Sequence, residues 1–285
     1  MAWKIVADSG CDLKEIPNLA PDTSYERVPL TIQVGNQVFV DDLELDIDNM
    51  MATMYASSAA ASSACPNPDA YAKAYQYADK LFVLTITGTL SGSQNSAQLA
   101  KQFLLERYPD KQIHVIDTLS AGGEIDLLVL ELNRLIGLGL SFEEIVERIS
   151  AYQEKTKLLF VLAKVDNLVK NGRLSKLVGK VVELLNIRMV GEASSQGTLE
   201  LLQKARGQKS AVAATFSEMQ KAGYAGGKVV IAHSNNPKIC QQLDGVIKAQ
   251  FPQADISVMK TSGLCSFYAE DGGGARSHRL DCLHP

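Results

Sequence analysis

Short apolar runs alternate with helix-like segments through the first half of the chain, and each run ends in a polar loop. The predicted strands are residues 3–7, 81–85 and 113–117. The predicted helices cover about residues 95–107, 124–138 and 141–156. Repetition of strand, loop and helix favours a parallel sheet with helices on its faces. Ligands of such sheets bind beyond the carboxyl ends of the strands, so the three polar loops are candidates for a binding site.

A hairpin and a short helix are predicted between the first two of these strands. Segments 28–34 and 37–40 flank Gly35 and Asn36, a strong two-residue turn signal. Asp48 is expected to cap a helix that continues to Met54. Residues 57–64 have low complexity and are expected to form a loop.

The pattern changes near residue 153. Strand-like runs in the second half are residues 158–163, 188–191 and 228–232. Helices are expected at about residues 166–169, 176–185, 207–222 and 237–251. We therefore predict an α/β protein of two domains, with a parallel-sheet α/β domain at residues 1–153 and an α+β domain at residues 154–273.

Composition and charge narrow the possible partners and compartment. The 285 residues carry a net charge of -4, which argues against a nucleic-acid partner. The apolar stretch after Lys4 is too short for a signal peptide, and no run of about 18 uncharged apolar residues predicts stable membrane insertion. The five cysteines show no CxxC spacing and are interpreted as free thiols. These features favour a cytoplasmic protein.

The usual signatures of cofactor and metal chemistry are missing from the sequence. It contains no GxGxxG, no GxxxxGK[ST] and no HExxH, so we expect no cofactor and no metal. The segment from Gly88 to Gly92 resembles the nucleophile elbow GxSxG around Ser91, but its first glycine is one residue too far away. A serine nucleophile also needs a base, and His233 is the best candidate. A serine-dependent acyl or phosphoryl transferase that uses Ser91 and His233 is therefore the alternative hypothesis.

Residues 87–93 could instead bind an anion. This loop offers hydroxyls and glycines directly before a predicted helix, where backbone N–H groups and the helix dipole favour negative charge. Without a phosphate signature or an excess of lysine, a carboxylate fits as well as a phosphate. A capped strand-to-helix turn without a ligand fits the same residues.

Eight short motifs, in order along residues 4–273, make the chain resemble the DegV family of bacterial fatty-acid-binding proteins. They correspond to the family's DS-x-x-DL loop, VPL segment, TSQPSP loop, LSGT loop, DS strand end, GGR segment, LLNIKP segment and late strand ending in histidine. In this sequence they are Ile5–Leu13, Val28–Ile32, Ser63–Pro68, Leu90–Ser93, Ile116–Thr118, Lys170–Leu174, Leu184–Arg188 and Ile231–His233.

The resemblance implies a binding function and a set of site residues. Members of the family bury a fatty acid between or beneath two domains and present it to a separate kinase that makes acyl phosphate. On this chain, Ser63 and Ser91 would hold the carboxylate, with Gly92 and Arg173 near the head group. Further candidates from the matching segments are Ser93, Asp8, Ser9 and His233. The leading hypothesis is thus a long-chain fatty-acid carrier that is not itself an enzyme, and a regulatory protein for another apolar acid is a third hypothesis.

Two departures from the family pattern affect these expectations. Residues 263–273 differ from the family's H-x-GPG segment, so its histidine has no counterpart to carry over. The family then continues as an apolar strand, whereas residues 274–285 of this chain show no strand alternation. We interpret residues 274–285 as a non-native tail, from a frameshift or a vector, and leave them out of the predicted domains.

Overall fold

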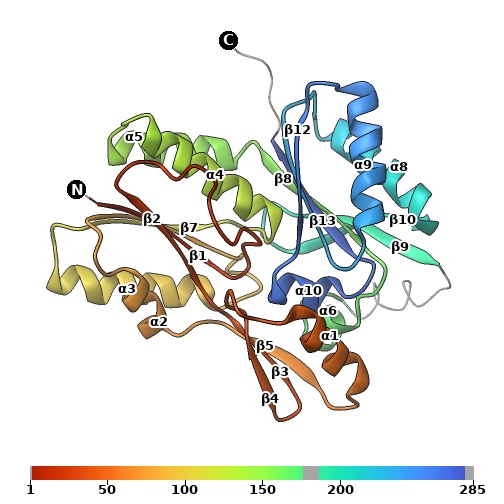
Figure 1. Cartoon of the computed structure of the whole chain (residues 1–285), viewed down its shortest axis with the longest axis horizontal. Helices are drawn as coiled ribbons and strands as arrows, with labels where there is room; N and C mark the ends of the chain where they lie inside the picture. The colour runs from red at the N-terminus through yellow and green to blue at the C-terminus, as the bar shows by residue number, and fades with distance from the viewer. Residues whose placement is uncertain (1, 176–185, 280–285) are drawn as a thin grey trace.

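The computed structural model describes residues 2–175 and 186–279. The helix predicted at residues 176–185 and the start of the motif at Leu184 lie outside the described residues. The fold contains a parallel sheet, drawn on the left of Figure 1, a mixed sheet on the right, and a small antiparallel sheet at the bottom. The predicted α/β architecture is confirmed.

The parallel sheet has the strand order β2-β1-β6-β7. Its strands are β1 (Trp3–Asp8), β2 (Thr23–Val28), β6 (Lys80–Thr85) and β7 (Gln112–Asp117). The predicted strands at 3–7, 81–85 and 113–117 are confirmed within one residue at either end. β1 and β6 are buried on both faces, which explains their continuous apolar runs.

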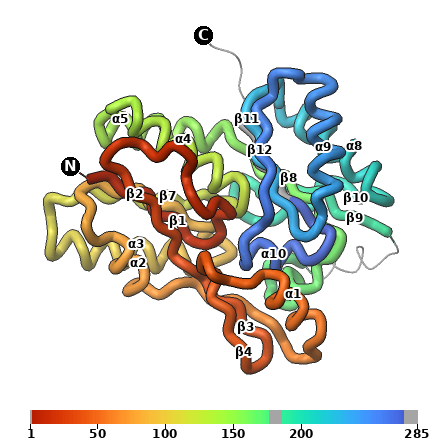
Figure 2. Tube along the Cα trace, in the orientation of Figure 1, coloured from red at the N-terminus to blue at the C-terminus, as the bar shows by residue number. Residues whose placement is uncertain are grey.

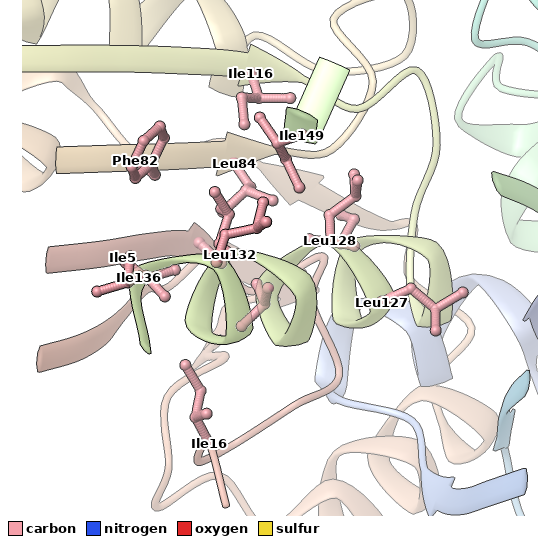
Figure 3. Close-up of a cluster of buried hydrophobic side chains, with 14 of the residues drawn as sticks. Ile5, Ile16, Phe82, Leu84, Ile116, Leu127, Leu128, Leu132, Ile136 and Ile149 are labelled. Carbon is pink, nitrogen blue, oxygen red and sulfur yellow. The ribbon is translucent and has the colours of Figure 1, made fainter. Parts of the chain in front are cut away.

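Helices cover both faces of this sheet (Figure 1). α2 (Pro68–Ala74) and α3 (Ser93–Arg107) pack on Val6, Leu81 and Val83. α4 (Gly123–Gly137) and α5 (Phe142–Gln153) pack on the other face, where Phe82 stacks on Phe142 with ring centroids 4.9 Å apart. Figure 3 shows this second cluster, with Leu128, Leu132 and Ile136 of α4 turned towards the sheet. Alternate residues of each strand thus enter two separate cores.

The mixed sheet has the order β10-β9-β8-β13-β11-β12. Its strands are β8 (Thr156–Leu162), β9 (Ile187–Ala193), β10 (Leu199–Arg206), β11 (Lys228–His233), β12 (Asp255–Lys260) and β13 (Gly274–Arg279). The long helices α8 (Gly207–Lys221) and α9 (Pro237–Gln250) cover one face. The short helices α6 (Asp166–Lys170) and α10 (Gly263–Ala269) pack on the other.

Residues 274–279, which we left out of the predicted domains because they show no strand alternation, are part of the fold. They form β13, which pairs antiparallel with both β8 and β11 in the middle of the mixed sheet. Backbone pairing on both sides positions this strand, and backbone hydrogen bonds do not require an apolar alternation in the sequence. The non-native origin of the segment stays a prediction.

The small sheet joins β4 (Gln37–Val40), β3 (Thr31–Val34) and β5 (Ala61–Ala64). The hairpin is confirmed, but residues 61–64 are a strand and not the expected loop, because they pair with β3. Helix α1 (Ile47–Ala56) begins two residues earlier than expected, with Asp46 as the N-cap in place of Asp48. Figure 2 shows α1 beside α10, which belongs to the second half of the chain. The boundary near residue 153 therefore stays a proposal, with α5 ending at Gln153 and β8 beginning at Thr156.

Truncation after Gly273 should strongly destabilise the protein. The shortened chain lacks β13, so backbone groups of β8 and β11 lose their partners inside the sheet. We expect a loss of several kcal/mol and a fall in Tm of about 10 °C or more, measured by circular dichroism. A chain that ends after Arg279 keeps β13 and serves as the control. Equal Tm values for the two truncated chains would contradict the assigned role of the strand.

Candidate functional site

A cavity of about 350 Å³ lies between the carboxyl ends of the parallel strands and one face of the mixed sheet. The loop after β6 contributes residues 86–87 and 90–92 to its wall, the loop after β7 contributes residues 120–122, and β5 contributes Ser63 and Ala64. The opposite wall comes from β8, β9, β10, α6 and α10. The cavity therefore lies where the polar loops of the parallel sheet were expected to bind a ligand.

One wall of the cavity is apolar because of the alternation along β8. Leu158, Phe160 and Leu162 line the cavity, whereas Leu159 and Val161 between them enter the core under α8 and α9. Gly191 on the neighbouring strand leaves room for this arrangement, since a Cβ atom there would lie 2.5 Å from Phe160 Cζ. The wall continues through Leu168 and Leu199 and suits a long apolar group.

The other end of the cavity is polar and holds four of the predicted site residues. Ser63, Ser91, Gly92 and Arg173 all lie on its wall, although they come from three separate segments of the chain. Ser63, Ser91 and Arg173 are half-buried and Gly92 is exposed, so this end reaches the protein surface. The structure brings these residues together, and their role in head-group binding stays a prediction.

The loop before α3 leaves backbone N–H groups of the first helical turn available as hydrogen-bond donors. Gly92 is the N-cap of α3 and offers no side chain to the first-turn N–H groups, although Ser91 Oγ accepts a hydrogen bond from Ser93 N (3.2 Å). A Cβ atom at position 92 would lie 2.9 Å from Cys65 Sγ, so glycine permits the close approach of the segment after β5. The N-terminus of α3 thus presents positive potential to the polar end of the cavity.

Backbone carbonyl groups hold Arg173 in place. Its Nη1 donates to Asn171 O (2.7 Å) and its Nε to Leu90 O (3.3 Å), next to Ser91. Asn171 Nδ2 donates in turn to Ala61 O (3.1 Å) on β5. Arg173 and Asn171 therefore connect the loop that carries Ser91 with the strand β5 that carries Ser63, and the arginine charge lies where an anionic group could enter.

Tyr268 belongs to the same polar end and was missed by the sequence analysis. Its hydroxyl group lies 2.8 Å from Ser63 Oγ, and the Arg173 guanidinium lies over its ring at 5.8 Å from the centroid. It lies on α10, within the segment that departs from the family pattern, so no motif marked it. A tyrosine that combines an apolar ring with a polar hydroxyl was the available signal.

Three further candidates, Asp8, Ser9 and Ser93, lie beneath the cavity and are absent from its wall among the described residues. The carboxylate of Asp8 accepts hydrogen bonds from Gly10 N (3.0 Å) and Ile86 N (2.9 Å). Burial raises the pKa of Asp8 to about 6, against the lowering effect of these bonds and of the Ser93 hydroxyl. Ser9 Oγ accepts from Leu30 N. Asp8 and Ser9 thus bond to backbone groups of the loops around the cavity, and the binding role of all three residues stays a prediction.

Three more buried carboxylates, those of Asp12, Asp41 and Asp126, accept hydrogen bonds from backbone groups, in two cases at the start of α10. Asp12 Oδ1 accepts from Ser262 N (2.7 Å) and Ser262 Oγ (2.9 Å), and Asp41 accepts from the N–H groups of residues 263 and 264. Asp126 Oδ1 accepts from the N–H groups of Asp12 and Leu13. Burial raises the pKa of Asp126, and the neighbouring carboxylate of Asp12 raises it further.

The structure does not bring Ser91 and His233 together. His233 ends β11 and is absent from the cavity wall, and no hydrogen bond between the two side chains occurs in the described part of the chain. Its Nδ1 instead accepts a hydrogen bond from Asn236 N (3.3 Å). The alternative hypothesis therefore lacks its base.

Within residues 2–175 and 186–279, no group of three or more His, Cys, Asp or Glu side chains could hold a metal ion. The same residues contain no helix that is both long and apolar enough to cross a membrane.

The fold and the cavity define a mixed α/β binding protein whose ligand space has a long apolar wall and one polar end. The family model described as "Uncharacterised protein, DegV family" matches residues 2–275. A DegV domain-containing protein of Streptococcus pneumoniae is 66% identical over 281 residues, which cover 99% of this chain and 100% of the relative. The chain belongs to the DegV family.

Solved structures of relatives have the same fold over nearly the whole length of this chain. The fatty acid kinase B3 protein of Streptococcus pneumoniae, loaded with linoleic acid, is 66% identical with a TM-score of 0.98, covering 99% of this chain and 100% of that one. A DegV family protein of Eubacterium eligens, loaded with heptadecanoic acid, is 39% identical with a TM-score of 0.95, covering 98% and 100%.

Replacement Asp126→Asn should change how stability depends on pH. Because the pKa of Asp126 is raised in the folded state, protonation of this carboxyl group stabilises the fold. The stabilisation is complete below the unfolded pKa of about 3.9 and is lost as the pH rises through the folded pKa. Asparagine keeps the Oδ1 acceptor but does not titrate. The stability of the wild type relative to Asp126→Asn should fall by more than about 1 kcal/mol between pH 4 and pH 8, measured by urea unfolding. Parallel pH profiles would contradict this assignment.

Proposed function

We propose that the protein binds one long-chain fatty acid in the cavity, with the carboxylate at Ser63 and Ser91 and the acyl chain along β8. The observation that carries this proposal is the cavity itself, in which an apolar wall ends at two hydroxyl groups and a guanidinium. Two relatives that are 66% and 39% identical were solved with fatty acids, linoleic acid and heptadecanoic acid. The fold is the same over nearly the whole chain in both.

Burial of the acyl chain supplies most of the affinity in this proposal. A methylene group removed from water contributes about 0.8 kcal/mol, so about 14 of them contribute roughly 11 kcal/mol before costs. Association and ordering take back several kcal/mol. The polar end then determines orientation, because a carboxylate that leaves water needs donors such as hydroxyl groups, N–H groups and Arg173.

We further propose that the protein is a carrier that presents its fatty acid to a separate kinase. The polar end is partly exposed while the apolar wall is buried, so the carboxylate would be accessible to another protein's active site. In the described part of the chain no histidine, aspartate or glutamate side chain is hydrogen-bonded to Ser91, so no base for chemistry on this chain is present there. The relative of 66% identity is named as a fatty acid kinase B3 protein, which supports the same kind of partner. A kinase that uses ATP would place the carrier in the cytoplasm.

Mass spectrometry of the purified protein tests the ligand directly. We expect native spectra to show one added mass of a C14–C18 fatty acid, which denaturation releases and lipid extraction identifies. A protein that purifies empty should gain Tm when such a fatty acid is added, since a ligand that binds only the folded state stabilises it. An empty protein with no thermal shift would contradict the proposed function, and another bound apolar acid would favour the regulatory hypothesis.

The double variant Ser63→Ala/Ser91→Ala tests the head-group assignment. Loss of two hydrogen bonds to a charged group should weaken fatty-acid binding by about tenfold or more, measured by displacement of a fluorescent fatty acid. The Tm of the ligand-free protein should change little, because both side chains are half-buried at a surface. Ser62→Ala/Ser150→Ala is the matched control, since neither side chain lines the cavity. Normal retention in the folded double variant would rule out these two serines as the head-group site.

A further inference from the structure

A second, polar cleft of about 240 Å³ lies on the far side of Thr261 from the fatty-acid cavity. It is formed at the carboxyl ends of the parallel pair β11 and β12 and closed by the start of α1. Thr261 lines both hollows, and its hydroxyl group lies 2.7 Å from Ser266 Oγ. The proposed fatty-acid function makes no use of this cleft.

His233 provides the cleft with a buried polar side chain. His233 is 7% exposed and lies on the cleft wall at the end of β11. Because Nδ1 accepts a hydrogen bond from Asn236 N, the proton of the neutral ring is on Nε2. Among the described residues Nε2 has no hydrogen-bond partner. Burial lowers the pKa of His233, and Lys260 lowers it further, which favours the neutral ring with its Nε2–H donor.

Exposed charges of both signs line the cleft. Lys14 and Lys260 line it together with His233, and the start of α1 adds its N-cap Asp46 and its first-turn residue Asp48. No ion pair within 4.0 Å joins either lysine to a carboxylate in the described part of the chain. Asp46 uses Oδ1 as the helix cap, through Asn49 N. Charges of both signs therefore line one cleft without pairing with each other in the described part of the chain.

We propose that this cleft binds a small zwitterion, whose anionic group contacts His233, Lys14 and Lys260 and whose ammonium group contacts Asp46 and Asp48. A simple anion would be repelled by the two aspartates and a simple cation by the two lysines, whereas a molecule with both charges finds a partner for each of them in this cleft. The anionic group is a phosphate or a carboxylate, both of which accept hydrogen bonds from imidazole and ammonium donors. A short polar link between the two charges suits the size and polarity of the cleft.

Calorimetric titration of the full-length protein tests this proposal with O-phosphorylethanolamine as the probe. Inorganic phosphate and ethanolamine each carry one of its two charged groups and serve as the comparison. The probe should bind about tenfold or more tightly than either. Binding should also raise the pKa of His233, followed by NMR of the imidazole, since a nearby anion favours the charged ring. Absence of binding, or equal affinity for the probe and phosphate, would overturn the proposal.

Variants with matched controls locate the site. Lys260→Met and Asp48→Asn should each weaken binding of the probe by about tenfold. Lys238→Met and Asp69→Asn are the controls, since Lys238 is an exposed lysine and Asp69 an exposed acid in the first turn of α2, both outside the cleft. All four variants should retain fatty acid and Tm, which separates failure of this site from failure of the fatty-acid cavity. Equal affinity in the cleft variants and the controls would refute the assigned residues.

The zwitterion could be a free molecule or the head group of a lipid, and sedimentation with vesicles separates these sources. Vesicles of phosphatidylethanolamine and phosphatidylglycerol are compared with vesicles of phosphatidylglycerol alone. Stronger binding to the first, lost in Asp48→Asn, supports the lipid source. Binding of the soluble probe without this difference supports a free molecule.

Discussion

Buried carboxylates that accept backbone N–H groups hold the two halves of the chain together. A carboxylate removed from water is costly unless donors surround it. Asp12 and Asp41 find their donors at residues 262–264, between 222 and 250 positions away along the chain. Those donors open α10, which carries Tyr268 into the polar end of the cavity. The position of α10 in the cavity wall therefore depends on hydrogen bonds to the carboxylates of Asp12 and Asp41 in the first half of the chain.

Residues 260–269 separate two hollows of different character. Leu264 and Tyr268 face the apolar cavity, whereas Lys260 and Ser266 face the polar cleft, and Thr261 lines both. The contrast arises because the cavity is completed by the apolar face of β8, and the cleft is completed by the charged start of α1. One segment therefore borders two hollows of different chemistry.

Predictions from local pattern succeeded where one segment determines its own environment. The buried runs of β1 and β6 and the turn at Gly35 and Asn36 carry their signals within a few residues. They failed where a partner strand supplies the structure: β5 forms by pairing with β3, and β13 by pairing with β8 and β11. Backbone hydrogen bonds between strands do not depend on the composition of a single strand. Low complexity at β5 and the missing alternation at β13 therefore did not exclude strands there.

The sequence by itself determined the α/β class, the strands of the parallel sheet and, through family motifs, the four residues at the polar end of the cavity. Only the tertiary structure decided that Tyr268 joins Ser63 and that His233 lies in a different hollow from Ser91. The physical reason is that strand and helix periodicity depends on neighbours within a few residues. A binding site depends on packing between segments that are about a hundred or more residues apart in the chain, and here 205 positions separate Ser63 from Tyr268.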